Sequence, residues 1–112
     1  MATVRTIATS EFDRDVLNAN SPVLVDFCTD WCGSCRAMDP VVEALSKKAD
    51  GRFQVVKVNV EKDRDLAIRY EIRSVPTFLI FKNGEIVFHH AGLPTGGRLA
   101  SALEDTVRFA AG

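Results

Sequence analysis

The sequence predicts an α/β fold in which a central mixed sheet of five strands is flanked by four helices. Short apolar runs rich in β-branched residues alternate with segments whose apolar residues recur every three or four positions, in the order βαβαβ and then αββα. The dipeptide Asn83-Gly84 lies between two such runs and is a strong hairpin signal, which adds an antiparallel pair to a sheet built from parallel crossovers. The length of 112 residues suits a single domain, and we expect it to cover residues 1–112.

The first half of the chain contains a charged residue and a proline where they are least expected. Asp26 interrupts an apolar run that is short enough to be a strand buried on both faces. Pro40 interrupts a helical pattern, which we expect it to kink. The expected elements are a strand at 3–7, a helix capped by Thr9 or Ser10 and ending at Ala19, a strand at 23–29 and a helix at 34–49.

The second half repeats this placement of a charge within a strand, because Lys57 stands among valines. Thr95 can cap the last helix, whose start Gly96 and Gly97 weaken. The expected elements are strands at 53–60, 77–82 and 85–91, a helix at 61–70, and a last helix with its apolar stripe at Leu99, Ala102, Leu103, Val107 and Ala110.

Composition and charge narrow the classes of function. The net charge of −1 gives no electrostatic reason to expect binding to nucleic acid or to an anionic membrane. No basic segment with an apolar run opens the chain, and nowhere do about 18 apolar residues occur together. We therefore expect a cytoplasmic protein in a reducing compartment. The alternative is the mature form of an organellar protein, because a removed transit peptide leaves no trace.

Cysteine usage points to reactive chemistry. The three cysteines are an odd number clustered at residues 28–35, which argues against a framework of structural disulfides. Cys32 and Cys35 have the spacing of a small disulfide ring, half of a metal site or a redox dithiol. Cys32 lies where a strand leads into a helix, and the unpaired N–H groups of a helix start stabilise a thiolate. This location favours a nucleophilic cysteine.

The segment Trp31-Cys32-Gly33-Ser34-Cys35 resembles the active site of the thioredoxin family, whose core is Trp-Cys-Gly-Pro-Cys. The resemblance spans essentially the whole chain and implies the thioredoxin fold. The other residues that match in order are Asp26, Pro40, Lys57, Tyr70, Ile72, Val75, Pro76, Thr77, Phe78, Phe81, Asn83, Gly84 and Gly92.

The resemblance implies a role for four residues. Cys32 would attack a target disulfide, and Cys35 would resolve the mixed disulfide, so that the two end as a redox disulfide. Burial of Asp26 should raise its pKa and make it a base for the Cys35 proton, either directly or through a water molecule; an aspartate at a strand end that faces solvent is the alternative. The family places Lys57 beside this aspartate, where it would offset part of the shift; a solvated lysine is the alternative.

The resemblance also implies a docking surface for target proteins. In the family the proline that corresponds to Pro76 is preceded by a cis peptide bond, which would hold the Val75 backbone where an extended substrate can pair with it. The residues of this expected surface are Trp31, Gly33, Ser34, Ser74, Val75, Pro76 and Gly92.

Two residues depart from the family pattern. Ser34 replaces a proline and so supplies an N–H group and a hydroxyl near Cys32, which should favour the thiolate and make the protein less reducing. Cys28 replaces a tryptophan. It is expected to be a small buried hydrophobic residue, with a third redox thiol or a regulatory partner for Cys32 as the alternative.

The function implied by the resemblance is reduction of protein disulfides. Thioredoxin reductase would be the electron donor and disulfide-containing proteins the substrates of a monomer that needs no bound cofactor. One alternative is a thioredoxin-like binding subunit whose thiols are incidental, and another runs the chemistry toward oxidation or isomerisation. We expect no metal site, because no second paired motif occurs and strand alternation sends His89 and His90 to opposite faces.

Overall fold

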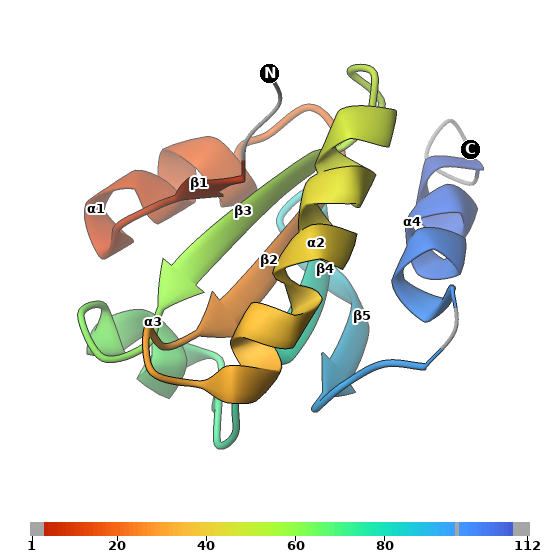
Figure 1. The fold of residues 1–112 in the computed structure, drawn as a ribbon. Helices are drawn as coiled ribbons and strands as arrows, with labels where there is room; N and C mark the ends of the chain where they lie inside the picture. Colours follow the sequence, from red (N-terminus) through yellow and green to blue (C-terminus); the bar gives the residue numbers. More distant parts are fainter. Residues whose placement is uncertain (1–3, 96, 109–112) are drawn as a thin grey trace.

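The computed structural model describes residues 4–95 and 97–108 and contains the expected five-stranded mixed sheet (Figure 1). The strand order is β1-β3-β2-β4-β5, with β1, β3 and β2 parallel and with β4 and β5 antiparallel to their neighbours. The elements are β1 (Arg5–Thr6), α1 (Thr9–Phe12), η1 (Asp13–Leu17), β2 (Val23–Cys28), α2 (Gly33–Lys48), β3 (Gln54–Asn59), α3 (Arg64–Arg69), β4 (Thr77–Lys82), β5 (Glu85–Ala91) and α4 (Arg98–Arg108).

Alternation along β2 divides the hydrophobic core into two halves. Successive side chains of a strand point to opposite faces of the sheet. Val23, Val25 and Phe27 therefore pack against α1, η1 and α3, whereas Leu24 packs against α2 and α4. All six residues of β2 are buried, as its apolar sequence predicts. The same alternation turns Asp26 and Cys28 toward the face that α2 covers.

The start of the first helix differs from the expectation. Ala8, and not Thr9 or Ser10, is the N-cap, and its N–H group donates to Oε1 of Glu11 at 2.9 Å. Thr9 instead donates from its backbone N and from Oγ1 to Oδ1 of Asp63. Asp63 is the N-cap of α3, so the Thr9 side chain links two helices rather than capping its own. The helix then continues as the π-helix η1.

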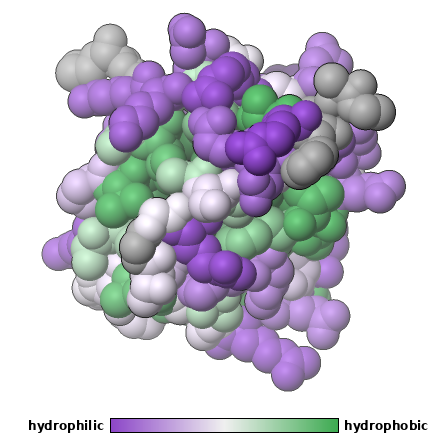
Figure 2. Space-filling view, turned by 90° about the vertical axis from the view of Figure 1, so that its right-hand side faces the viewer, coloured by the Kyte–Doolittle hydropathy of each residue, from purple (hydrophilic) through white to green (hydrophobic). Residues whose placement is uncertain are grey.

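The last helix also begins later than a cap at Thr95 would place it, because α4 starts at Arg98. Its polar face is exposed, and Figure 2, which views this side of the molecule, shows apolar areas broken up by hydrophilic side chains. No helix among the described residues is long and apolar enough to cross a membrane. Of the expected stripe, Leu99 and Leu103 are buried, Ala102 and Val107 pack partly buried against the core, and Ala110 lies outside the described residues.

The β4–β5 hairpin has the bounds that the sequence predicts. Asn83 and Gly84 both have positive φ, at 53° and 80°, which is the conformation of a tight two-residue hairpin turn. β4 lies between β2 and β5 and runs antiparallel to both. Thr77, at the start of β4, therefore pairs with Phe27 of β2 on one side and with Ala91 of β5 on the other. The end of β2, the start of β4 and the end of β5 therefore meet at one edge of the sheet.

Candidate active site

The segments that meet at this edge carry most of the expected site residues. The loop after β2 leads through Trp31 into α2, whose N-cap is Cys32. The peptide bond between Val75 and Pro76 is cis. The carbonyl oxygen of Val75 accepts a long hydrogen bond of 3.9 Å from Sγ of Cys32. The N–H group of Gly92 donates to the carbonyl oxygen of Pro76 at 2.7 Å. Chain segments more than 40 residues apart thus surround Cys32.

Cys32 caps α2 with its own sulfur. Its backbone is extended, with φ −81° and ψ 116°, and its Sγ accepts the N–H group of Cys35 at 3.2 Å. A side chain that accepts an N–H group at N3 is the arrangement that serine or aspartate usually gives a helix start. Here a sulfur takes this place, so the end of the helix stabilises negative charge on it.

These contacts lower the pKa of Cys32. The largest contribution is a hydrogen bond from the Cys35 thiol, and the backbone N–H groups of Cys35 and Ser34 add to it. Burial acts in the opposite direction, because a thiolate loses solvation in the protein, but it does not outweigh the hydrogen bonds. Cys32 is therefore the thiol of this pair that ionises more readily.

Cys35 lies one turn further into α2 and is 3% exposed, compared with 7% for Cys32. Burial raises the pKa of Cys35, and its hydrogen bond to Cys32 raises it further. The neighbouring Cys28 thiol and the backbone of Thr29 act in the opposite direction. The two thiols are thus unequal, because one is stabilised as a thiolate and the other as a thiol.

Asp26 is buried, with no exposed surface, beside this pair. Burial raises its pKa to about 6, even though a hydrogen bond from Cys28 and the charge of Lys57 oppose the shift. Its Oδ2 atom has no hydrogen-bond partner among the described residues. A carboxylate in this environment accepts a proton more readily than an exposed one.

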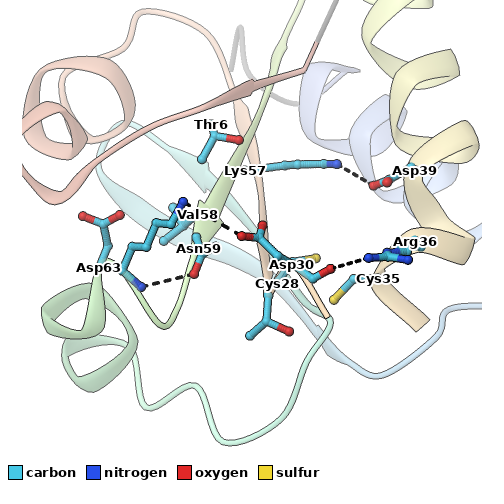
Figure 3. Close-up of a pocket in the computed structure, with 12 residues that line it drawn as sticks. Thr6, Cys28, Asp30, Cys35, Arg36, Asp39, Lys57, Val58, Asn59 and Asp63 are labelled. Atoms are coloured by element: carbon cyan, nitrogen blue, oxygen red, sulfur yellow. Dashed lines mark hydrogen bonds and ion pairs between the residues drawn. The ribbon is translucent and has the colours of Figure 1, made fainter. Parts of the chain in front are cut away.

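Lys57 has a closer partner than Asp26. The two residues are opposite each other in the β2–β3 register, but Nζ of Lys57 hydrogen-bonds to Oδ1 of Asp39 on α2 (Figure 3). Burial is the largest single effect and opposes the charge of Lys57, but the hydrogen bond to Asp39 and the negative charges of Asp39 and Asp26 together raise the pKa of the lysine. Lys57 is half-buried, and so it is not the solvated lysine of the alternative. Sequence reasoning missed Asp39, although it follows Cys35 by four residues and so shares its side of the helix.

Cys28 is buried as expected but is not only a packing residue. Its Sγ donates to Oδ1 of Asp26 at 2.8 Å. It also lines a pocket of about 350 Å³ together with Cys35, Asp39 and Lys57 (Figure 3). Within the described parts of the chain, no group of three or more His, Cys, Asp and Glu side chains is placed to hold a metal ion.

The expected docking residues form the outer side of the site. Trp31 is 69% exposed, and its Nε1 atom donates to Oε1 of Glu61, which holds the indole beside the start of α2. Of the other expected residues, Gly33, Ser34 and Ser74 are exposed, Val75 and Gly92 are half-buried, and Pro76 is buried.

The backbone N–H group of Ser34 gives a prediction for the reduction potential. This group helps to lower the pKa of Cys32, and a proline at the same position has no N–H group to offer. A hydrogen bond to a charged group contributes about 1.5 kcal/mol, which corresponds to roughly 30 mV for a two-electron couple. Ser34→Pro is therefore expected to make the potential more negative by roughly 30 mV. Equilibration with glutathione buffers measures this, and an equal or less negative value would contradict it.

Comparisons with known proteins agree with this geometry. A model of the family described as Thioredoxin matches residues 3–106. "Thioredoxin C-2" of Corynebacterium nephridii is 40% identical over 106 residues, which cover 95% of this chain and 98% of the relative. "Thioredoxin" of Synechocystis sp. is 41% identical over 104 residues, which cover 93% of this chain and 97% of the relative.

Proposed function

This chain belongs to the thioredoxin family of thiol-disulfide oxidoreductases, and from this premise we propose that it reduces disulfide bonds in other proteins. The observation that carries the proposal is the unequal pair of thiols, with Cys32 at the start of α2 and Cys35 behind it. The whole chain acts as one domain and one monomer in the cytoplasm, without a bound cofactor.

The reaction begins with Cys32. Its thiolate attacks one sulfur of a target disulfide, so that a mixed disulfide forms and the second target sulfur leaves as a thiolate. Cys35 then attacks Sγ of Cys32 and releases the first target sulfur. The target leaves as a dithiol, and the chain is left with a disulfide between Cys32 and Cys35.

Cys35 needs help to react, because its pKa is raised. Asp26 is the base that takes the proton of Cys35, since a buried carboxylate with a raised pKa binds a proton more tightly than an exposed one. The positive charge of Lys57 stabilises the ionised form of Asp26 and so offsets part of the rise in its pKa. The hydrogen bond to Asp39 holds Lys57 in place.

Target proteins dock on the surface around Cys32. The exposed Trp31 ring gives an apolar contact, and the backbone of Val75 gives a hydrogen-bonding edge for an extended segment. A thioredoxin reductase supplies the electrons that return the disulfide to the dithiol. The proposed docking residues are Trp31, Gly33, Ser34, Ser74, Val75, Pro76 and Gly92.

A trapping experiment tests this function. Cys35→Ser cannot resolve the mixed disulfide. It is therefore expected to accumulate as covalent complexes with disulfide-bonded insulin and with proteins of a cell extract, and dithiothreitol should break these complexes. The double variant Cys32→Ser/Cys35→Ser is the matched control and should form none. Equal amounts of complex from both variants would contradict the proposal and favour a binding subunit whose thiols are incidental.

A further inference from the structure

Cys28 is a buried thiol for which the proposed reaction has no step. It is 8% exposed and belongs to a small buried cluster with Cys32 and Cys35. Its Sγ–H group donates to Oδ1 of Asp26 at 2.8 Å, so the side chain has a defined polar partner. A buried polar group normally has a hydrogen-bond partner, and the partner of Cys28 is the carboxylate that acts as the base in the proposed reaction.

The geometry places Cys28 between the base and the thiol that the base serves. Asp26 and Cys28 are two residues apart in β2 and therefore point to the same face, which α2 covers with Cys35. The Cys28 and Cys35 side chains belong to the same buried cluster and line the same pocket, where Figure 3 shows the two residues side by side. Among the described residues, Asp26 accepts a hydrogen bond from Cys28 and none from Cys35.

We propose that the Cys28 thiol relays the proton of Cys35 to the carboxylate of Asp26 during the resolving step. This inference rests on the proposed function, in which Cys35 attacks the mixed disulfide. As the new bond forms between the sulfurs of Cys35 and Cys32, the Cys35 proton passes to Cys28 and the Cys28 proton passes to Oδ1 of Asp26. The bond between Cys32 and the target breaks, and its electron pair leaves on the target sulfur, which takes a proton from solvent.

Cys28 is suited to pass a proton and not to react itself. Burial raises the pKa of the Cys28 thiol, and the charge of Asp26 raises it further, so the residue remains a thiol and is a poor nucleophile. After the transfer its S–H group points to Cys35, which agrees with the effect of Cys28 in lowering the pKa of Cys35. Cys28 thus holds a proton at both ends of the step and is not consumed.

Threonine and valine at position 28 provide a matched pair, because they have nearly the same shape and only threonine has a group that can relay a proton. The reduced protein is mixed with one equivalent of dithiobis(nitrobenzoate) in a stopped-flow instrument. The first release of thionitrobenzoate reports attack by Cys32, and the second reports resolution by Cys35.

We expect Cys28→Val to slow the second phase about tenfold or more at pH 7 and Cys28→Thr to stay within about threefold of the unmodified protein. The first phase should change little in either variant. The difference should disappear at high pH, where Cys35 ionises without a base. The charged or titratable groups that face this route are Cys28 and Asp26 from β2, Lys57 from β3, and Cys32, Cys35 and Asp39 from α2. Where a β-branched variant does not fold, Cys28→Ser and Cys28→Ala replace the pair.

A double-mutant cycle separates a relay from simple packing. If the route ends at Asp26, adding Cys28→Val to Asp26→Asn should slow the second phase no further. Val55→Ala, a core change away from the cysteines, controls for loosened packing and should leave both phases nearly unchanged. Equal second phases for the valine and threonine variants, or additive effects in the cycle, would overturn the relay. Absence of the second phase in the unmodified protein would instead contradict the proposed function.

Discussion

Cys32→Ser is expected to lower the rate of insulin disulfide reduction by about a thousandfold or more, close to the uncatalysed rate with dithiothreitol. A serine hydroxyl at this position has the same helix start around it but does not ionise near neutral pH. The hydrogen bonds that stabilise a thiolate at Cys32 remain, but serine provides no charged nucleophile for them to stabilise. Because the first covalent step is lost, no later step can compensate.

The comparison with Cys35→Ser shows which step has failed. That variant keeps Cys32 and should react with a target disulfide once, without turnover, whereas Cys32→Ser should not react at all. Insulin precipitation measures turnover, and mass spectrometry of the protein measures the single mixed disulfide. A Cys32→Ser protein that retains more than about a tenth of the catalysed rate would rule out Cys32 as the nucleophile.

Asp26→Asn is expected to stabilise the reduced protein by about 3 kcal/mol at pH 8. The pKa of Asp26 is raised by burial from 3.8 to about 6, so folding favours the protonated carboxyl. Below pH 4 both the folded and the unfolded chain are protonated, and the carboxyl imposes no penalty. Between about pH 4 and pH 6 the unfolded chain loses this proton first, and stability falls by about 1.4 kcal/mol per pH unit. Above pH 6 the penalty is constant, and asparagine removes it.

Urea unfolding at pH 4, 6 and 8 measures this difference in the free energy of unfolding. The stabilisation should grow from near zero at pH 4 to its full value at pH 8. Asp105→Asn is a suitable control, because Asp105 is exposed and its ion pair with Arg108 is long, at 3.8 Å; we expect an effect within about 0.5 kcal/mol. A gain for Asp26→Asn that is the same at all three pH values would contradict the account of its burial.

The sheet could be predicted from the sequence because its signals are local. β4 and β5 have the expected bounds, since the apolar runs end where Asn83 and Gly84 require positive φ. The ends of the helices could not be predicted as well. Thr9 has the side chain of an N-cap, but Asp63 lies near it in the folded chain and takes its hydrogen bonds. A contact across 54 residues leaves no local signal.

The candidate site divides in the same way. The positions of Cys32 and Cys35 follow from a strand that leads into a helix, and the burial of Asp26 follows from its strand. The partner of Lys57 depends on how α2 lies across β3, and the sequence does not encode this register in any short motif. The hydrogen bond of Cys28 could have been anticipated, because Asp26 stands two residues away on the same face.

The most direct test of the account is the rate at which iodoacetamide alkylates Cys32 as a function of pH. The account predicts that Cys32 is labelled first, with a midpoint below the ordinary thiol pKa of about 8.5, while Cys35 and Cys28 are labelled far more slowly. Labelling of Cys32 at the rate and midpoint of a thiol in an unstructured peptide would contradict it.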